Sequence, residues 1–288
     1  MSIPSPANAS SPPSIGHYEN FPVASVLCPP RLRPPIAAIY HFARTADDIA
    51  DEGDAPARQR LDDLAAMHAD LLAVAAGQPH SGRWPQVFGP LADMIRAFEL
   101  PVPLLADLLD AFTQDVIKTR DQAVYADRAE LLDYCRRSAD PVGRLLLHLY
   151  GVRDEAALRM SDNICSALQL INFWQDLSLD IPRGRHYLPE QDCAAQGVSF
   201  SDLKALRQTP NATTLIAGHA RWARELMEQG APLVHRIPGR AGWELRLVVQ
   251  GGLRILDKIE ALNFATLNTR PRLGPLDGMV MIWRSFWM

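Results

Sequence analysis

Two pairs of aspartates in this sequence share one spacing, Asp47 with Asp51 and Asp176 with Asp180. An α-helix turns by about 100° per residue, so side chains four positions apart lie on the same face. Two carboxylates on one face of an apolar helix need a compensating partner, because uncompensated buried charge is very costly. Mg²⁺ is a natural partner, since it takes oxygen ligands and is commonly held by one or two carboxylates together with substrate phosphate oxygens.

The second pair lies at the end of a segment, 154–180, that contains no Pro or Gly. Asn172 stands four residues before Asp176, and Gln169 stands three residues before Asn172, so both extend the polar stripe. Apolar residues surround this stripe on nearly every other side: Leu168, Leu170, Ile171, Phe173, Trp174, Leu177 and Leu179. A helix that is apolar almost all round is a buried helix. We expect Phe173 and Trp174 to pack in its core.

The first pair lies in the segment FARTADDIADE, where Asp48 follows Asp47 and Arg44 precedes it by about one turn. An isolated pair of this kind is most simply two exposed carboxylates at a helix end. Two such pairs on two mostly apolar helices are more specific, since together they could hold several Mg²⁺ ions around one diphosphate. We therefore expect Asp47, Asp51, Asp176 and Asp180 to face a common cavity from two antiparallel helices.

The elements that must position these residues are all helical. Apolar periodicity, broken by Pro and Gly, predicts about ten helices. The longer ones are expected at 34–52, 55–76, 86–99, 104–118, 128–150, 154–180, 213–233 and 242–268, and a short one at 201–207. We expect a kink near Pro141 and Gly143, and a Pro- and Gly-rich break at 271–278. Sustained alternation of apolar and polar residues is absent, so the sequence predicts an all-α fold without a sheet.

Composition narrows the class of protein. The 288 residues carry a net charge of −4 without a basic run, which argues against a nucleic-acid partner. The four cysteines have no regular spacing and are expected to be reduced thiols of a cytoplasmic protein. We expect residues 1–16 to form a disordered tail and 17–288 a single domain. The apolar segment 279–288 is expected either to dock on the protein or to lie at a membrane surface as a peripheral anchor.

Three segments carry a resemblance to a known family: HYENFPVAS, FARTADDIADE and ALQLINFWQDLSLDIPRGRHYLP. Over roughly residues 17–270 the chain resembles the squalene and phytoene synthases, which join prenyl diphosphates head to head. Within that family the segments are most similar to the hydroxysqualene synthase branch of bacterial hopanoid biosynthesis. The resemblance implies an isoprenoid-synthase-type helical bundle around a central cavity.

The resemblance also implies roles for individual residues. It assigns Mg²⁺ binding to Asp47, Asp48, Asp51, Asn172, Asp176 and Asp180, with the four spaced aspartates catalytic. It places Tyr40, Tyr134 and Tyr187 near the reacting chain. It assigns substrate contacts to His17, Phe21, Arg44, Gln169, Asn172, Arg185 and Tyr187. Relatives of the phytoene type have Arg before the second motif, where this chain has Gln175, so one cation near the diphosphate is missing by this interpretation.

The implied reaction is the Mg²⁺-dependent conversion of presqualene diphosphate to hydroxysqualene, without a nicotinamide, in functional coupling with the neighbouring enzymes of the squalene pathway. Condensation of two prenyl diphosphates to presqualene diphosphate, squalene or phytoene is the alternative within the family. Outside it, an all-α nucleotide pyrophosphohydrolase would also use helical carboxylates and Mg²⁺, although such sites are usually rich in Glu. A non-enzymatic helical scaffold would leave the paired aspartates unexplained.

Overall fold

The computed structural model describes residues 28–237 and 239–288, and in this part of the chain it contains helices and no strand. The predicted all-α fold is therefore confirmed. The predicted substrate contacts His17 and Phe21, like the predicted tail, lie outside the described residues. The α-helices are α1 (Arg33–Asp51), α2 (Ala57–Ala75), α3 (Pro85–Phe98), α4 (Val102–Asp121), α5 (Arg128–Ser138), α6 (Asp140–Leu149), α7 (Glu155–Asp180), α8 (Glu190–Ala195), α9 (Phe200–Lys204), α10 (Pro210–Gly230), α11 (Gly239–Ala261) and α12 (Pro275–Ser285).

Several predicted boundaries are wrong. The expected helix 242–268 is α11, which already ends at Ala261. The expected single helix 128–150 is two helices, which separate at Ala139, where the backbone leaves the helical region (φ −121°, ψ −50°). Pro141 then stands in the first turn of α6, where its missing N–H costs nothing. The expected break at 271–278 ends early, because α12 already begins at Pro275. Its first turn is closed by Asp277, which accepts a hydrogen bond from the backbone N–H of Gly274 (2.6 Å).

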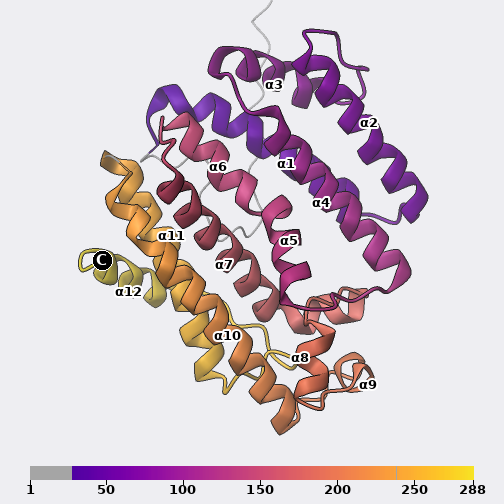
Figure 1. Cartoon of the computed structure of the whole chain (residues 1–288), viewed down its shortest axis with the longest axis vertical. Helices are drawn as coiled ribbons and strands as arrows, with labels where there is room; N and C mark the ends of the chain where they lie inside the picture. The colour runs from indigo at the N-terminus through magenta and orange to yellow at the C-terminus, as the bar shows by residue number, and fades with distance from the viewer. Residues whose placement is uncertain (1–27, 238) are drawn as a thin grey trace, which may run out of the picture.

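Helix α7 runs through the middle of the bundle, with α1 to α4 on one side and α10 to α12 on the other (Figure 1). Its start is fixed by Asp154, whose carboxylate accepts a hydrogen bond from the backbone N–H of Ala157 (2.9 Å). Gly143 lets α6 approach α7 closely, since a Cβ at this position would collide with Ser161 and Cys165. The long central helix is thus the element against which both halves of the chain pack.

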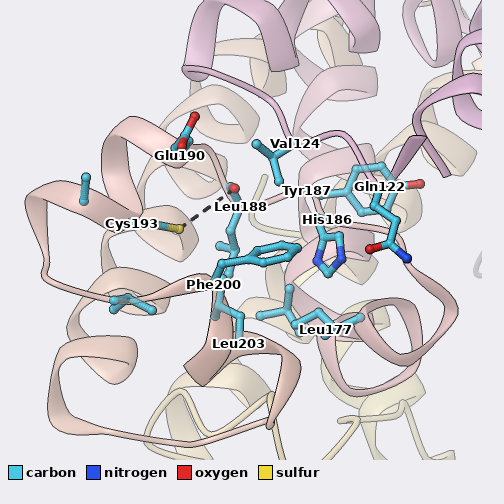
Figure 2. A pocket seen from close by; sticks show the side chains of 13 residues that line it. Gln122, Val124, Leu177, His186, Tyr187, Leu188, Glu190, Cys193, Phe200 and Leu203 are labelled. Carbon is cyan, nitrogen blue, oxygen red and sulfur yellow. Dashed lines mark hydrogen bonds between the residues drawn. The ribbon is translucent and has the colours of Figure 1, made fainter. Parts of the chain in front are cut away.

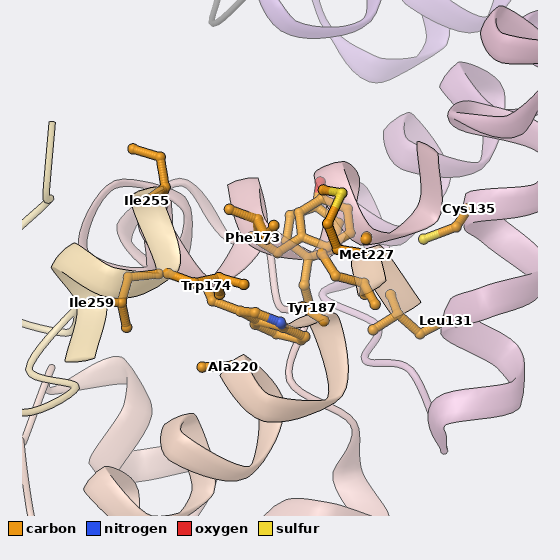
Figure 3. Close-up of a cluster of buried hydrophobic side chains, with 14 of the residues drawn as sticks. Leu131, Cys135, Phe173, Trp174, Tyr187, Ala220, Met227, Ile255 and Ile259 are labelled. Carbon is orange, nitrogen blue, oxygen red and sulfur yellow. The ribbon is translucent and has the colours of Figure 1, made fainter. Parts of the chain in front are cut away.

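The apolar side chains form two core clusters rather than one. The first, built mainly by α1 to α4, includes Phe42 and Phe88, whose ring centroids lie 6.0 Å apart. The second surrounds α7 and includes Phe173 and Trp174, which are 5% and 0% exposed, so the prediction that both pack in the core is confirmed (Figure 3). Helix α6 contributes side chains to both clusters and lies along the seam between them.

Candidate active site

One arginine joins the two aspartate pairs. Arg185 follows α7 in the loop after a short 3-10 turn, and its guanidinium forms an ion pair with Asp51 at the end of α1. The same group lies 4.0 Å from Asp180 at the end of α7. Asp51 and Asp180 are therefore brought to one place, although 129 residues separate them.

The two helices run in the same direction, so the prediction of antiparallel helices is wrong. Both carboxylate pairs stand at the C-terminal ends of their helices, and both ends meet at Arg185. Only helices that run side by side in the same sense can bring these two ends together while lining one cavity along their length. The C-terminus of a helix carries partial negative charge, so the arrangement adds two helix ends to the carboxylates and favours bound cations.

The rest of the first motif is paired within its own helix. Arg44 donates to Asp47 (2.9 Å) and to Glu52 (3.1 Å), and its guanidinium lies 2.7 Å from Asp48. The side chain of Asp48 is 46% exposed and that of Asp47 is 35% exposed, so this end of α1 is partly open to solvent. Arg44 lies where it could exchange these carboxylates for an incoming anion.

A cation that the sequence pattern missed lies against the second motif. Arg270, in the segment between α11 and α12, donates from Nη2 to Oδ2 of Asp176 (3.0 Å) and from Nε to its other oxygen. Gln175 is buried and donates to the carbonyl of Pro271 (2.7 Å). The interpretation that Gln175 leaves Asp176 with a neutral neighbour is therefore wrong. No local signal could have revealed this pair, because 94 residues separate its members.

A third acidic helix also reaches the site. Asp115 on α4 accepts a hydrogen bond from the hydroxyl of Tyr134 (2.5 Å); Tyr134 is buried and Asp115 is half-buried. Burial raises the pKa of Asp115 to about 7, and the nearby charge of Asp51 adds to this rise while the bond from Tyr134 opposes it. Sequence reasoning missed Asp115, because no second acidic residue stands four positions from it on α4.

Two carboxylates of the spaced pairs, those of Asp47 and Asp180, are hard to ionise in the absence of cations. Burial raises the pKa of Asp47 to about 7, and Asp51 raises it further while Arg44 opposes the shift. Burial likewise raises the pKa of Asp180 to about 7, against the lowering effect of Arg185. Burial opposes the charge of Arg185, but Asp51, Tyr187 and Asp180 raise its pKa. The site thus holds more negative charge than its arginines compensate.

The raised pKa values of Asp47 and Asp180 predict how the stability of the metal-free protein depends on pH. Asp47 and Asp180 have folded-state pKa values of about 7, above their ordinary value of 3.8, so the folded state binds more protons between these limits. The stabilisation from protonation is complete below about pH 4 and is lost as the pH rises through 7. We therefore expect these two groups to lower the unfolding temperature in EDTA between pH 6 and pH 8.

The measurement is a thermal unfolding series at both pH values, with the Asp47→Asn/Asp180→Asn variant beside the wild type. The variant should lose less stability across this interval, because neither Asn titrates. An equal loss in the two proteins would contradict the assignment of these pKa values.

An apolar cavity of about 350 Å³ lies between α1, α6, α7 and α11. From α1 it is lined by Ile36, Ile39, Tyr40 and Ala43, and from α7 by Ser161, Ile164, Cys165 and Leu168. Along α1 the next positions on this face are 47 and 51, and along α7 they are 172, 176 and 180. The same two helix faces therefore line the apolar cavity first and then carry the carboxylates.

The other predicted site residues are distributed between these regions. Tyr40 lines the apolar cavity, while Gln169 and Asn172 are half-buried on α7 between the cavity and Asp176. Tyr187 is buried, and its ring stacks on that of Phe173 with centroids 3.7 Å apart and planes at 8°. The ring centroids of Tyr134 and Tyr187 lie 6.4 Å apart. Asp115 and Arg185 are among the charged groups near Tyr187.

A second cavity, of about 430 Å³, lies on the other side of Tyr187 (Figure 2). It is lined by apolar side chains from the end of α7 and from α8 and α9, together with His186. The imidazole of His186 packs against Phe200 with centroids 4.6 Å apart, and burial lowers its pKa, so the ring is neutral. Tyr187 lines this cavity, and it also lies near enough to Asp115, Asp180 and Arg185 for their charges to affect its pKa.

The four spaced aspartates offer the oxygen ligands that a divalent metal such as Mg²⁺ takes. In the described part of the chain, no three Asp, Glu, His or Cys side chains converge on one point as a complete metal site would require. Mg²⁺ is commonly held by only one or two carboxylates, with substrate oxygens and water completing its shell. Asp47, Asp51, Asp176 and Asp180 supply such oxygens from two helices. Burial raises the pKa of Asp47 and of Asp180, and a neighbouring aspartate raises each further, so a cation would favour their ionised forms. The residues present therefore fit this kind of metal.

Comparisons of the sequence and of the structure with known proteins identify the same family. A sequence model of the squalene/phytoene synthase family matches residues 16–277. The chain is 33% identical to a hydroxysqualene synthase of Rhodopseudomonas palustris over 91% of its length and 86% of the relative's. It is 30% identical to a phytoene synthase of Thermus thermophilus over 94% of its length and 89% of the relative's. The crystal structure of squalene synthase HpnC from Alicyclobacillus acidocaldarius is 35% identical, with a TM-score of 0.77 over 86% of this chain and 90% of that one.

Proposed function

Because this chain belongs to the squalene/phytoene synthase family, we propose that it converts presqualene diphosphate to hydroxysqualene with release of diphosphate. The proposal is supported by the similarity to hydroxysqualene synthases over nearly the whole chain. An enzyme of this kind uses a substrate made by prenyl diphosphate condensation, and its product requires a later reduction, so it would be coupled to enzymes on either side of its step.

The observation that carries the proposal is the continuity of the two helix faces. The face of α1 that lines the cavity at Tyr40 and Ala43 reaches Asp47 one turn later, and the face of α7 passes from Leu168 to Asp176 in two turns. A molecule with a diphosphate head and a long apolar chain has the same division into a charged end and an apolar end. A nucleotide would instead need polar groups in the region that the apolar cavity occupies.

The first chemical step breaks the carbon–oxygen bond, and the diphosphate leaves with the electron pair. Bound Mg²⁺ would neutralise the charge that develops on the leaving oxygen. Arg44, Arg185 and Arg270 lie beside the carboxylates, and each can transfer its N–H donors from an aspartate to the departing diphosphate. Cations held by Asp47, Asp51, Asp176 and Asp180 would keep these carboxylates compensated when the arginines turn to the diphosphate.

The second step requires a dry environment. The cyclopropylcarbinyl cation left behind rearranges within the apolar cavity, where Tyr40 can turn its ring face toward the positive charge. One water molecule then adds to the rearranged cation and loses a proton, which gives the alcohol. Exclusion of other water from the cavity prevents earlier capture of the cation.

The test is an activity assay in which purified protein is incubated with Mg²⁺ and presqualene diphosphate in the absence of NADPH, and the products are identified. We expect hydroxysqualene and diphosphate as products, no turnover in EDTA, and little or no reaction with farnesyl diphosphate alone. Conversion of farnesyl diphosphate to presqualene diphosphate, or of larger prenyl diphosphates to phytoene, would refute the proposed substrate. Squalene formed only with NADPH would assign the chain to a reductive reaction.

One observation favours the second candidate, condensation of two prenyl diphosphates. An enzyme that holds two diphosphates needs additional cations, and Arg270 supplies one at the second motif despite Gln175. Relatives named phytoene synthase and presqualene diphosphate synthase are 30% and 28% identical to this chain. The farnesyl diphosphate arm of the same experiment distinguishes the two reactions.

A further inference from the structure

Helix α12 docks on α11 through its polar side. Asp277 is 3% exposed and forms ion pairs with Arg254 and Lys258 of α11, both at 2.7 Å. At the other end of α12, Arg246 of α11 donates to the carbonyl of Ser285 (3.1 Å). Ser285 is itself 1% exposed. Met281 also packs inward, with its methyl group beside Gly251 of α11. Helices usually turn their apolar face toward the protein, so a contact that includes a buried aspartate and serine is unusual.

The opposite side of α12 and the residues after it are apolar and exposed. The exposed fractions are 72% for Leu276, 63% for Met279, 54% for Ile282, 65% for Trp283, 62% for Phe286 and 75% for Trp287. These positions recur every three or four residues and therefore form one stripe. Trp243 of α11, 42% exposed, packs edge to face on Phe286 with centroids 5.1 Å apart and extends the stripe. We name these seven residues the α12 face.

The composition of the α12 face is that of a membrane-surface anchor. Helices at a membrane surface place Trp and Phe at the level of the lipid headgroups. Leu, Ile and Met can insert among the upper parts of the acyl chains. Monomeric proteins rarely leave a contiguous apolar patch of this kind uncovered unless it binds something. Helix α12 itself lies at the edge of the bundle, beside α11 (Figure 1).

Charge in the surrounding sequence favours a lipid surface over another apolar partner. Residues 235–288 contain eight Lys and Arg and four Asp and Glu, a side-chain charge of +4, whereas the whole chain carries −4. Arg240 and Arg272 in this segment are exposed. Anionic headgroups attract such a segment and repel the rest of the protein, so the charge distribution orients the molecule with the α12 face toward the bilayer.

Helix α12 is too short to cross a membrane. Its 11 residues span about 16 Å, roughly half of a bilayer's hydrocarbon thickness. Among the described helices, none is long and apolar enough to span a bilayer. We propose that the α12 face binds the surface of an anionic lipid bilayer.

The α12 face lies close to the part of α11 that lines the apolar cavity. Trp243 belongs to the same turns of α11 as Glu244, Leu245 and Val248, which line the apolar cavity. Bilayer contact at Trp243 and Phe286 therefore brings acyl chains to the helix that forms one wall of the cavity. A water-insoluble chain could pass between cavity and bilayer with little exposure to water.

The test is co-sedimentation with vesicles of phosphatidylglycerol and phosphatidylcholine, without substrate, so its outcome is independent of the proposed reaction. We expect the full chain to bind, and Trp283→Glu/Trp287→Glu to lower the partition coefficient by at least about tenfold. The matched control is Leu72→Glu/Ile117→Glu, which changes two other exposed apolar residues, 52% and 37% exposed, and should bind like the wild type. Thermal unfolding confirms that both variants fold.

Equal binding by the Trp variant and the wild type would overturn the proposal, as would failure of the wild type to bind. A dimer seen by light scattering that the Trp variant abolishes, together with no vesicle binding, would assign the face to a second copy of the chain and also overturn it. Quenching of tryptophan fluorescence by brominated lipids in the wild type, reduced in the Trp variant, is the second expected result.

Discussion

Asp180→Asn is expected to lower kcat by about 10²–10³-fold, the usual effect of removing one group that stabilises transition-state charge. Asp180 stands where α7 meets Arg185, and its oxygen is one of those that would hold Mg²⁺. The amide keeps the shape of the carboxylate but lacks its charge. The loss should therefore appear in steady-state turnover of presqualene diphosphate at saturating Mg²⁺.

The same substitution should stabilise the metal-free protein, and this second result separates a catalytic effect from misfolding. Burial and Asp176 both raise the pKa of Asp180, so removal of its charge relieves repulsion at pH 8. Glu155→Gln is the control, since Glu155 is 86% exposed at the other end of α7. Unfolding temperatures below the wild-type value in EDTA, or normal turnover, would contradict the assignment of Asp180.

Ala43→Trp is expected to lower kcat/KM by about 10²-fold or more, because a displaced substrate loses the geometry needed for reaction. Ala43 lines the apolar cavity one turn before Asp47, so a larger side chain there obstructs the passage from the charged site to the cavity. Inhibition by inorganic diphosphate with Mg²⁺ should remain, since the carboxylates and arginines are unchanged.

The matched control is Ala65→Trp, at an exposed position of α2. It should keep the wild-type kcat/KM. Full activity of Ala43→Trp on presqualene diphosphate would show that the substrate chain does not use this cavity, whereas loss of diphosphate inhibition would indicate damage to the charged site instead.

The helical fold could be predicted because it depends on local patterns. The apolar run before Asp47 and the uninterrupted segment before Asp180 indicate helices, and Asp127 and Asp154 cap α5 and α7. The repeated four-residue spacing also predicted that the two motifs share a site. Each of these signals is contained within a few turns of one helix.

The parts that could not be predicted depend on contacts between distant segments. Arg270 and Asp176 meet because the segment after α11 folds back over α7, and Asp115 meets Tyr134 across two helices. The relative direction of α1 and α7 is a property of the whole bundle, which is why the expected antiparallel arrangement failed. The resemblance to a family supplied residue roles but not these pairings.

The seam between the two core clusters has a consequence for how the protein unfolds. Each cluster packs largely within itself, and α6 and the ion pairs of Arg185 are among the few elements that join them. Structures of this kind open in separate cooperative units. In EDTA, amides of α2 and those of α10 should therefore exchange hydrogen with different opening free energies. A metal–diphosphate group held by Asp51 and Asp180 would connect α1 and α7 across the seam, so we expect the ligand to merge the two units into one cooperative transition.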